Sequence, residues 1–374
     1  MNRISDILQK EKCTSLILFT GKSSYHSSGA DQVIPKMLSD LNIRYEHYSV
    51  SGEPSPDFVD KTAAAAGALS PQYILSVGGG SVIDAGKAVS AMLKADKPVK
   101  TYLEGVGTES PPGEKVPFIA VPTTSGTGSE ATKNAVLSEV GKNGFKKSLR
   151  HDNYVPDYAV IDPELMLTCP VKITAPSGLD AITQLVEAYV STKANPVTDA
   201  YVEAGLKSAG RWFDDACREG AESIEAREGM AFAAFCSGVA LANAGLGVVH
   251  GIAGLVGGLY PASHGVLCGT VMGPATKLIV KKLRELGKPG LRGLKKYGQA
   301  GVFITGEDRG SDSENADNFA EKIQLWIHEF SLPGLGSFGI DAESCKYLAS
   351  KAGLKNTPVE LSPDEIAEIL EASL

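Results

Sequence analysis

The sequence lacks the features expected of a membrane-spanning, secreted or nucleic-acid-binding protein. No apolar run approaches the roughly 20 residues that a membrane-spanning helix needs, and the first residues, MNRISDILQKEK, include no apolar segment typical of a signal peptide. The formal net charge of −8 argues against nucleic acid or an anionic membrane surface as the main partner. We therefore expect a cytoplasmic protein whose partners are small molecules.

Cysteine and histidine are also scarce. The six cysteines are scattered and form no C-x-x-C pair, which indicates free thiols in a reducing compartment rather than a disulfide framework or a cysteine metal site. Only six histidines occur in the whole chain. Two of them, His250 and His264, lie within one short glycine-rich segment and are therefore candidates for a shared site.

What the sequence does have is a change of pattern near its middle. With 374 residues and a hydrophobic content of 43%, the chain is long enough for two domains. Up to Pro170, short apolar runs alternate with helix-like segments, which predicts a parallel sheet with helices on both faces. The expected strands are 16–20, 44–50, 73–77 and 118–121, and the expected helices are 31–41, 57–69 and 81–93.

After Pro170 the alternation disappears. Long helix-like segments follow at 180–191, 198–217, 225–243, 271–286, 315–330 and 363–373, without a convincing strand. We therefore expect residues 1–170 to form a Rossmann-like α/β domain and residues 171–374 to form an all-α domain.

Two glycine-rich loops follow strands of the first domain. In the stretch YILSVGGGSVIDAGK, three glycines separate an apolar strand from a helix that begins near Ser81. Such a turn brings backbone N–H groups close to a phosphate at a helix N-terminus, so we expect Gly79, Gly80 and Ser81 to hold the pyrophosphate of a dinucleotide. The third glycine of G-x-G-x-x-G is missing, and a tight strand-to-helix turn is the alternative explanation.

Asp84 lies in the first turn of the same helix, where its charge suits the helix dipole but would repel a phosphate. We expect it to bond a ribose or nicotinamide group, or only to support the helix. The second loop, PTTSGTGSE at 122–130, is rich in hydroxyls that suit the sugar and ring edges of a nucleotide. An ordinary Ser/Thr-rich turn with a helix cap is the alternative there.

Asp180, His250 and His264 indicate a metal site. The histidines lie in VVHGIAGLVGGLYPASHGVL, where a helix carrying His250 and a break near Pro261 would return His264 beside it, while Asp180 is expected to open another helix. One carboxylate and two imidazoles suit Zn²⁺ or Fe²⁺ and leave a position for substrate oxygen. Against a metal site stand a capping box from Ser177 to Asp180 and histidines that satisfy buried carbonyls.

Together these stretches resemble the iron-containing, or group III, alcohol dehydrogenase family. The resemblance spans the whole chain. It rests on GGGSVIDAGK, PTTSGTGSE, PDYAVIDPE at 156–164, GLDAIT at 178–183, EAYVS at 187–191, the segment 250–264, and the tail from LPGL at 332–335 to LSPDEI at 361–366. The family implies a dinucleotide-binding domain joined to a helical domain, with metal and substrate in the cleft between them, and a homodimer or larger oligomer.

Position by position, the resemblance implies a cofactor site and a metal site. The implied cofactor contacts are Gly79, Gly80, Ser81, Thr123, Thr124, Thr127, Thr132 and Lys147. The implied metal ligands, which would also carry catalysis, are Asp180, His250 and His264.

Two positions depart from the family pattern. Gln184 stands one helical turn after Asp180, where the family's fourth ligand is a histidine. Because an amide oxygen is a poor ligand for a borderline metal, zinc is expected rather than iron, and a weak or absent metal stays open. Gly254 stands where a second histidine often lies near the nicotinamide, so we expect a roomier pocket and an atypical substrate.

Cofactor preference and substrate charge depend on two short segments. The end of the second expected strand, 47–52, has no carboxylate before Glu53, so nothing there would repel a 2′-phosphate, and NADP(H) is slightly favoured over NAD(H). The basic cluster KKSLRH at 146–151 would bind an anionic substrate or the cofactor phosphates, or would be only a solvated face.

The leading expectation is an NAD(P)-dependent oxidoreductase that transfers hydride reversibly between a small alcohol and its aldehyde, with the metal as a Lewis acid. A second hypothesis is a metal-independent reductase of a keto or unsaturated acid, resembling maleylacetate reductases, in which the basic cluster holds the carboxylate. A third is a lyase resembling dehydroquinate synthase, which regenerates its NAD in each cycle. The last is a paralogue that binds dinucleotide without catalysis.

Overall fold

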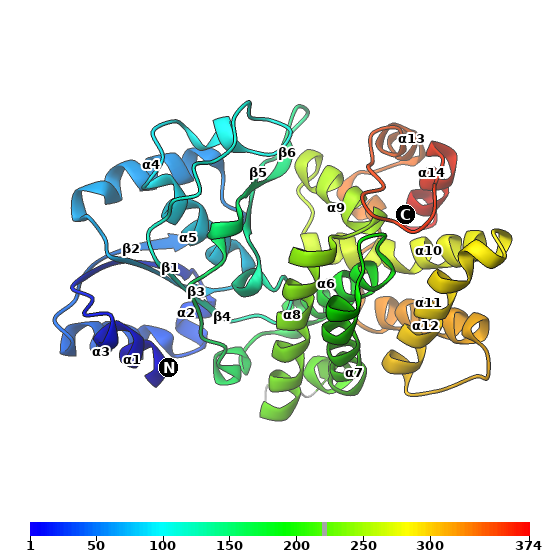
Figure 1. Cartoon of the computed structure of the whole chain (residues 1–374), viewed down its shortest axis with the longest axis horizontal. Coiled ribbons are helices and arrows are strands. Elements are labelled where there is room, and N and C mark those ends of the chain that lie inside the picture. Colours follow the sequence, from blue (N-terminus) through cyan, green and yellow to red (C-terminus); the bar gives the residue numbers. More distant parts are fainter. Residues whose placement is uncertain (219–222) are drawn as a thin grey trace.

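The chain folds into an α/β half and a helical half that lie side by side (Figure 1). A computed structural model describes residues 1–218 and 223–374. The first helix of the helical half begins at Val171. The predicted fold class, a parallel α/β domain followed by an all-α domain, is confirmed.

Five parallel strands form the sheet of the α/β half, in the order β2-β1-β3-β4-β7. They are β1 (Ser15–Gly21), β2 (Arg44–Val50), β3 (Tyr73–Gly78), β4 (Phe118–Pro122) and β7 (Tyr158–Ala159). β1, β3 and β4 are buried along their whole length. Because a central parallel strand is covered on both faces, its sequence is continuously apolar, and this is why β1, β3 and β4 could be predicted. β2 lies at the edge of the sheet and is mostly exposed.

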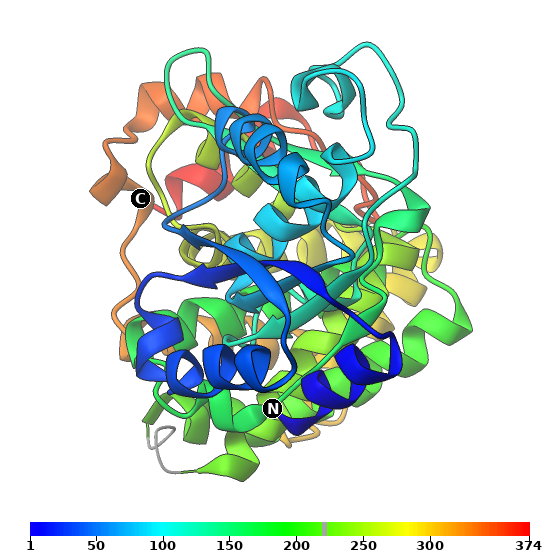
Figure 2. The ribbon, with the colours of Figure 1, turned by 90° about the vertical axis from the view of Figure 1, so that its left-hand side faces the viewer.

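Helices cover both faces of this sheet (Figure 2). One face carries α1 (Asn2–Lys10), α2 (Ser24–Ser27) and α3 (Ala30–Asp40), and the other carries α4 (Pro56–Ala66) and α5 (Gly80–Met92). Alternate residues of β1 point to opposite faces of the sheet. Leu16 and Leu18 pack against α1, α2 and α3, whereas Ile17 and Phe19 pack against α4 and α5.

A separate antiparallel hairpin, which the sequence pattern did not predict, consists of β5 (Asn134–Glu139) and β6 (Phe145–Arg150). Only Leu149 of β6 is buried, so this strand lacks the apolar alternation that marks a strand in a sequence. The hairpin packs against α9 (Val248–Leu259) of the helical half (Figure 1). A Cβ at Gly258 of α9 would lie 2.8 Å from the backbone of Phe145, so glycine permits this contact.

Helices account for the regular structure of the C-terminal half, and no strand occurs among its described residues. The α-helices are α6 (Val171–Val190), α7 (Pro196–Arg218), α8 (Ile224–Ala244), α9 (Val248–Leu259), α10 (His264–Glu285), α11 (Leu291–Thr305), α12 (Asp312–Glu329), α13 (Ala342–Ala349) and α14 (Pro363–Glu371). Short 3-10 turns elsewhere in the chain are Gly67–Leu69, Val99–Tyr102, Ser129–Ala131, Asp152–Tyr154, Pro163–Met166, Lys288–Gly290 and Leu335–Phe338. The sequence pattern missed α11, whose glycines weaken the helix signal; a Cβ at Gly301 would lie 2.1 Å from Asn315 O of α12.

Two helix starts were predicted wrongly. α10 begins at His264 and not at the expected Val271. We expected Asp180 to open a helix, with a capping box from Ser177 to Asp180 as the alternative to a metal site, but α6 already begins at Val171 and both residues lie inside it. Pro176 also lies within α6, and such a proline in a sequence suggests a helix boundary. Here the helix continues through it, and Asp180 sits at mid-helix among buried neighbours.

In the described part of the chain, no single helix has both the length and the apolar character to cross a membrane. α8 and α9 meet those criteria only as a pair, and they are bent by 98° relative to each other.

Candidate active site

The two glycine-rich loops begin side by side at the carboxyl edge of the sheet. Gly78 at the end of β3 is paired with Pro122 at the end of β4, and Thr123 N–H donates to Gly78 O over 3.0 Å. Ligands of open parallel sheets bind beyond these strand ends. The two loops therefore form one continuous surface of the kind that a dinucleotide requires.

Small residues let the loops approach each other closely. A Cβ at Gly80 would lie 2.6 Å from Thr127 Cγ2, and one at Gly79 would lie 3.3 Å from Thr124 Oγ1. Gly79 is also the N-cap of α5, and no described side chain caps that helix end. The first N–H groups of α5 are thus left for a phosphate to bind.

The predicted cofactor contacts fall into three groups by exposure. Half-buried at this surface are Gly79, Gly80, Ser81, Thr124 and Thr127. Thr123 and Thr132 are buried and belong to the layer beneath the surface. Lys147 is exposed on β6, on the outer side of the hairpin.

Lys87, which the sequence reasoning did not select, ties α5 to the second loop. Its buried ammonium group donates to the carbonyl oxygens of Ser129, Thr132 and Asn134 over 2.7, 2.8 and 2.9 Å. It also lies 3.1 Å from Thr132 Oγ1. The hydroxyl of Thr132 therefore supports this lysine, and the lysine in turn fixes the shape of the loop.

Two buried acids accompany Lys87. Asp84 Oδ2 accepts a hydrogen bond from Val136 N–H of β5 over 3.1 Å, a geometry that matches the supporting role among its two expected roles. Burial raises the pKa of Asp84 to about 6 and that of Glu130 to about 7. Burial lowers the pKa of Lys87 to about 8, although both acids oppose that shift. The three groups form a coupled charge cluster beneath the loops.

Asp180, His250 and His264 converge from three helices of the other half. Asp180 Oδ1 lies 3.2 Å from His250 Nε2 and 3.8 Å from His264 Nε2. Cys268, one turn after His264 on α10, joins them with its Sγ 3.6 Å from His250 Nε2 and 3.7 Å from His264 Nε2. The four donor atoms all lie within 4.8 Å of one another. The scattered cysteines had argued against any cysteine at a metal site.

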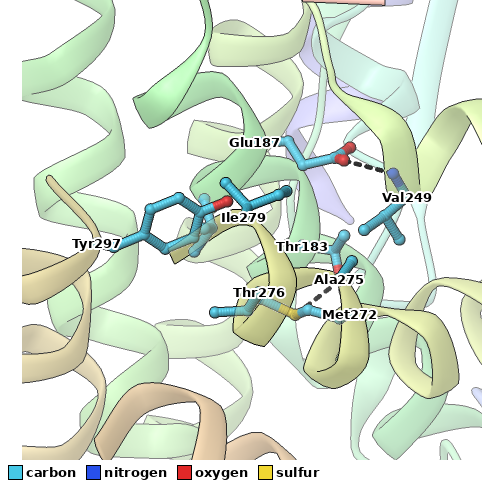
Figure 3. A pocket seen from close by; sticks show the side chains of 9 residues that line it. Thr183, Glu187, Val249, Met272, Ala275, Thr276, Ile279 and Tyr297 are labelled. Atoms are coloured by element: carbon cyan, nitrogen blue, oxygen red, sulfur yellow. Dashed lines mark hydrogen bonds between the residues drawn. The ribbon is translucent and has the colours of Figure 1, made fainter. Parts of the chain in front are cut away.

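Glu187 orients His250 and the start of α9. Glu187 Oε2 lies 2.7 Å from His250 Nδ1, and Oε1 accepts from Val249 N–H over 2.7 Å. Figure 3 shows this carboxylate pointing to Val249, beside a small interior pocket that Tyr297 also lines. A carboxylate at a helix N-terminus is favoured by the helix dipole. Because Glu187 holds Nδ1, the other ring nitrogen of His250 faces the cluster.

Gln184 is turned away from a ligand role. Its Oε1 accepts a hydrogen bond from Ser237 Oγ over 2.9 Å, and its Nε2 donates to Asp180 Oδ2 over 3.3 Å. Ser237 Oγ also lies 3.5 Å from Gly126 O in the second loop. Gln184 therefore fixes the carboxylate of Asp180 and links the cluster to the nucleotide surface.

The electrostatics of the cluster favour a cation. Burial alone would raise the pKa of Asp180, but its interactions with His264 and His250, which include a hydrogen bond from His250, lower it to about 2. Burial and the charge of Lys146 lower the pKa of His264 well below its usual value. Burial opposes protonation of His250, but Cys268 and Asp180 raise its pKa well above the usual value. A metal ion binding here would displace that proton.

The donor set fits a divalent metal ion. A carboxylate oxygen and two imidazole nitrogens converge at one point, where Asp180 and His250 are buried and the side chain of His264 is 24% exposed, and this is the donor chemistry of zinc and iron sites. The bond between His250 Nδ1 and Glu187 is the carboxylate support that metal-binding histidines usually have. Asp180, His250 and His264 are thus able to hold such an ion.

On β6, Lys146 faces the cluster and Lys147 does not. The side chain of Lys146 is 6% exposed and pairs with Glu53 from the segment after β2. A Cβ at Gly257 of α9 would lie 3.8 Å from its Nζ, and its charge affects the pKa of His264. Because strand side chains alternate, Lys147 points the other way.

The sequence reasoning missed Cys268, Glu187 and Lys87. For the first two, the spacing from a predicted metal ligand could have identified them. Cys268 follows His264 by four residues, and Glu187 follows Asp180 by seven. Both spacings place side chains on one helix face, so they would have revealed these partners once the helix bounds were known. Lys87 had no comparable signal, because its acceptors are backbone carbonyls.

Comparison with known proteins finds relatives along the whole chain. A family model described as iron-containing alcohol dehydrogenase matches residues 1–163, and one described as Fe-containing alcohol dehydrogenase family, C-terminal, matches residues 174–374. The NAD-dependent methanol dehydrogenase of Bacillus methanolicus is 30% identical over 361 residues, which cover 93% of this chain and 90% of that protein.

Two further relatives agree with these matches. Long-chain-alcohol dehydrogenase 1 of Geobacillus thermodenitrificans (strain NG80-2) is 31% identical over 347 residues, which cover 88% of this chain and 84% of that protein. A crystal structure of 1,3-propanediol oxidoreductase superposes with a TM-score of 0.87 at 27% identity and covers 99% of this chain and 95% of that one.

Proposed function

Because the chain belongs to the iron-containing alcohol dehydrogenase family, we propose that it transfers hydride reversibly between a nicotinamide dinucleotide and a small alcohol or aldehyde. The observation that best supports this proposal is the convergence of Asp180, His250 and His264 at one point, with His264 partly exposed. Gln184 donates to Asp180, and Ser237 lies 2.9 Å from Gln184 Oε1 and 3.5 Å from Gly126 O, so these two residues lie between that point and the loop at 122–130.

Asp180, His250 and His264 would hold the metal, for which zinc and iron are the candidates. A metal held there would supply Lewis-acid chemistry to the substrate oxygen. Two residues of the chain orient the ligands: Glu187 fixes the ring of His250, and Gln184 fixes the carboxylate of Asp180. Fixed ligands and a water-poor site keep the reacting groups in a productive geometry.

The two glycine-rich loops would hold the dinucleotide, with its pyrophosphate at the N-terminus of α5. We propose that NADP(H) is accepted along with NAD(H). The end of β2 carries no carboxylate before Glu53, and Glu53 is engaged by Lys146. A free acidic residue that would repel a 2′-phosphate is therefore missing at this strand end among the described residues.

The substrate pocket would be open on the α9 side. A Cβ built at Gly254 would meet no heavy atom of the described residues within 4 Å, so this position leaves space where a histidine side chain would otherwise lie. We propose small alcohols and aldehydes as substrates and a homodimer as the assembly, which sedimentation would measure.

A second candidate is the reduction of a keto or unsaturated acid, and the buried side chain of Lys146 favours it. An ammonium group near His264 would attract a substrate carboxylate. Lys146→Ala should then raise the KM for keto acids by about tenfold, as expected for one charged contact of about 1.4 kcal/mol. Lys147→Ala is the matched control on the outer side of the same strand, and it should leave that KM unchanged.

The test is oxidation of NADH and NADPH against a panel of short aldehydes and keto acids, in chelated protein and after zinc or iron is restored. Aldehyde reduction that vanishes with chelator and returns with metal supports the proposal. Keto-acid reduction that ignores chelator supports the second candidate. Turnover without net NADH oxidation would point to a lyase, and dinucleotide binding without any turnover would contradict an enzymatic function.

A further inference from the structure

We propose that Cys268 is the fourth ligand of the metal ion, in place of the histidine that the family pattern has at the position of Gln184. This inference rests on the proposed function, in which Asp180, His250 and His264 hold a metal. In the family pattern the fourth ligand lies one turn after the aspartate on α6. Here a donor lies one turn after the second histidine on α10 instead.

The orientation of its amide argues against Gln184 as the fourth donor. Its only metal-binding atom, Oε1, lies 2.9 Å from Ser237 Oγ, and the amide nitrogen is the end that faces Asp180. An amide nitrogen carries protons rather than a free lone pair and does not ligate a cation. Gln184 thus acts as a positioning residue for Asp180 Oδ1, the oxygen that faces both histidines.

The distances around Cys268 match a four-coordinate ion. With bonds of about 2.3 Å to sulfur and about 2.0 Å to nitrogen, a tetrahedral zinc ion places these two donors about 3.5 Å apart. Cys268 Sγ lies 3.6 and 3.7 Å from the two histidine Nε2 atoms. The thiol is fully buried, and its neighbours in the cluster are all potential ligands. In the metal-free protein these separations are also those of thiol hydrogen bonds to the two rings, and the thiol proton would be released when a metal binds.

A thiolate ligand changes what the site binds. Cysteine thiolates are common zinc ligands, and for a given set of nitrogen and sulfur donors zinc binds more tightly than iron(II) in the Irving–Williams order. Asp180 and a Cys268 thiolate together neutralise the two charges of the ion, whereas a histidine in place of the cysteine would leave one positive charge. The site should therefore select zinc, and its ion should be a milder Lewis acid than one held by three histidines.

The direct test is the absorption spectrum of the chelated full-length protein after loading with cobalt(II). We expect a thiolate-to-cobalt charge-transfer band in the near ultraviolet together with the strong visible bands of a four-coordinate ion. Cys268→Ala should abolish the charge-transfer band and weaken zinc binding by roughly 100-fold or more in chelator competition, because the loss of a supporting partner alone costs 10–100-fold. Cys345→Ala, which removes a buried thiol of α13, should change neither.

A double variant separates ligation from folding. Adding Gln184→His to Cys268→Ala should restore tight metal binding without the charge-transfer band. Cobalt bound by the wild-type protein without that band overturns the role of Cys268 and leaves the proposed function intact. The band without any aldehyde turnover keeps Cys268 as a ligand and contradicts the proposed function. Wild-type protein that binds no cobalt overturns the inference as well.

Discussion

The nucleotide surface and the metal cluster are assembled from the sequence in opposite ways. The nucleotide surface consists of two loops, each continuous in sequence, that start at neighbouring strand ends. The metal cluster takes its donors from α6, α9 and α10, whose residues meet only after the helices have packed. The nucleotide surface is therefore visible in the sequence as runs of adjacent residues, whereas the metal ligands are isolated residues that meet only in the folded protein.

The two regions also differ in what supports them. Backbone groups dominate around the loops, where Lys87 binds three carbonyl oxygens. Side chains dominate around the cluster, where Glu187 and Gln184 orient ligands. Substitutions should therefore separate the two binding functions: cluster variants should lose metal and turnover but keep dinucleotide binding, and loop variants should lose dinucleotide binding, and with it turnover, but keep the metal.

The largest effect is expected for Asp180→Ala. Lewis-acid stabilisation is worth several kcal/mol, and each 1.36 kcal/mol changes a rate tenfold, so kcat should fall by about a thousandfold or more. Metal content measured on the purified variant should fall with it. Fluorescence titration should show NADH affinity within about twofold of wild type, because Asp180 does not touch the loops. If Asp180→Ala lost NADH affinity together with metal and turnover, the two regions would not be independent.

Gly80→Val should have the opposite outcome. The new side chain would collide with Thr127, since even a Cβ would lie 2.6 Å from its Cγ2. We expect unfolding free energy to drop by about 1–3 kcal/mol, as for other overpacked sites, and NADH affinity to drop at least tenfold. Bound metal should stay at the wild-type level.

The control for this loop variant is Gly67→Ala. Gly67 lies at the end of α4 with ordinary helical dihedral angles and has open space around it. There the substitution should leave NADH affinity unchanged and stabilise the fold slightly, by about 0.4–1 kcal/mol in urea unfolding. Weak NADH binding by Gly67→Ala would show that the loops respond to remote changes in stability.

Gln184→Ala should weaken the link between the metal cluster and the nucleotide surface. Without the amide, Asp180 Oδ2 loses its donor, and metal affinity should fall by about 10–100-fold, as for other partners of metal ligands. Chelator competition measures this affinity directly. Metal affinity that increases on substitution would contradict the positioning role of Gln184.

The smallest effect concerns pH and the charge cluster beneath the loops. The pKa of Glu130 is raised from 4.5 to about 7 in the folded state, so the folded protein binds more protons than the unfolded chain between these values. The stabilisation from Glu130 is complete below pH 4.5 and is lost as pH rises through about 7. We expect a loss of roughly 1–3 kcal/mol of unfolding free energy over this range.

Glu130→Gln is the variant that isolates this contribution. Urea unfolding at several pH values should show a flatter dependence between pH 5 and pH 7 than in the wild type. Above about pH 8 both proteins should gain stability, because the lowered pKa of Lys87 means that the folded state releases a proton that the unfolded chain retains. An unchanged slope in the variant would show that Glu130 does not titrate in this range.

The sequence allowed prediction wherever a pattern was local and apolar. The buried strands β1, β3 and β4, the helices α3, α4 and α5, and the break between α9 and α10 near Pro261 follow from such patterns. The hairpin of β5 and β6 was missed because its second strand is mostly polar, and the start of α6 was missed because Pro176 lies inside the helix. Tertiary contacts decided both cases.

The candidate site shows the same division. Asp180, His250 and His264 were proposed from residue types and a resemblance, and the structure brings them together. Cys268 could not be selected from cysteine spacing, because its partners are histidines and an aspartate on other helices. Likewise, no single-residue pattern tells which of two adjacent lysines on a short strand faces inward.

The most direct test of the account is a metal titration of chelated wild-type protein, with NADH-dependent aldehyde reduction and bound metal measured in the same samples. Turnover should rise in proportion to bound metal and saturate at one ion per chain, while the His250→Ala variant should stay inactive at every metal concentration. Full turnover in the metal-free wild-type protein would contradict it.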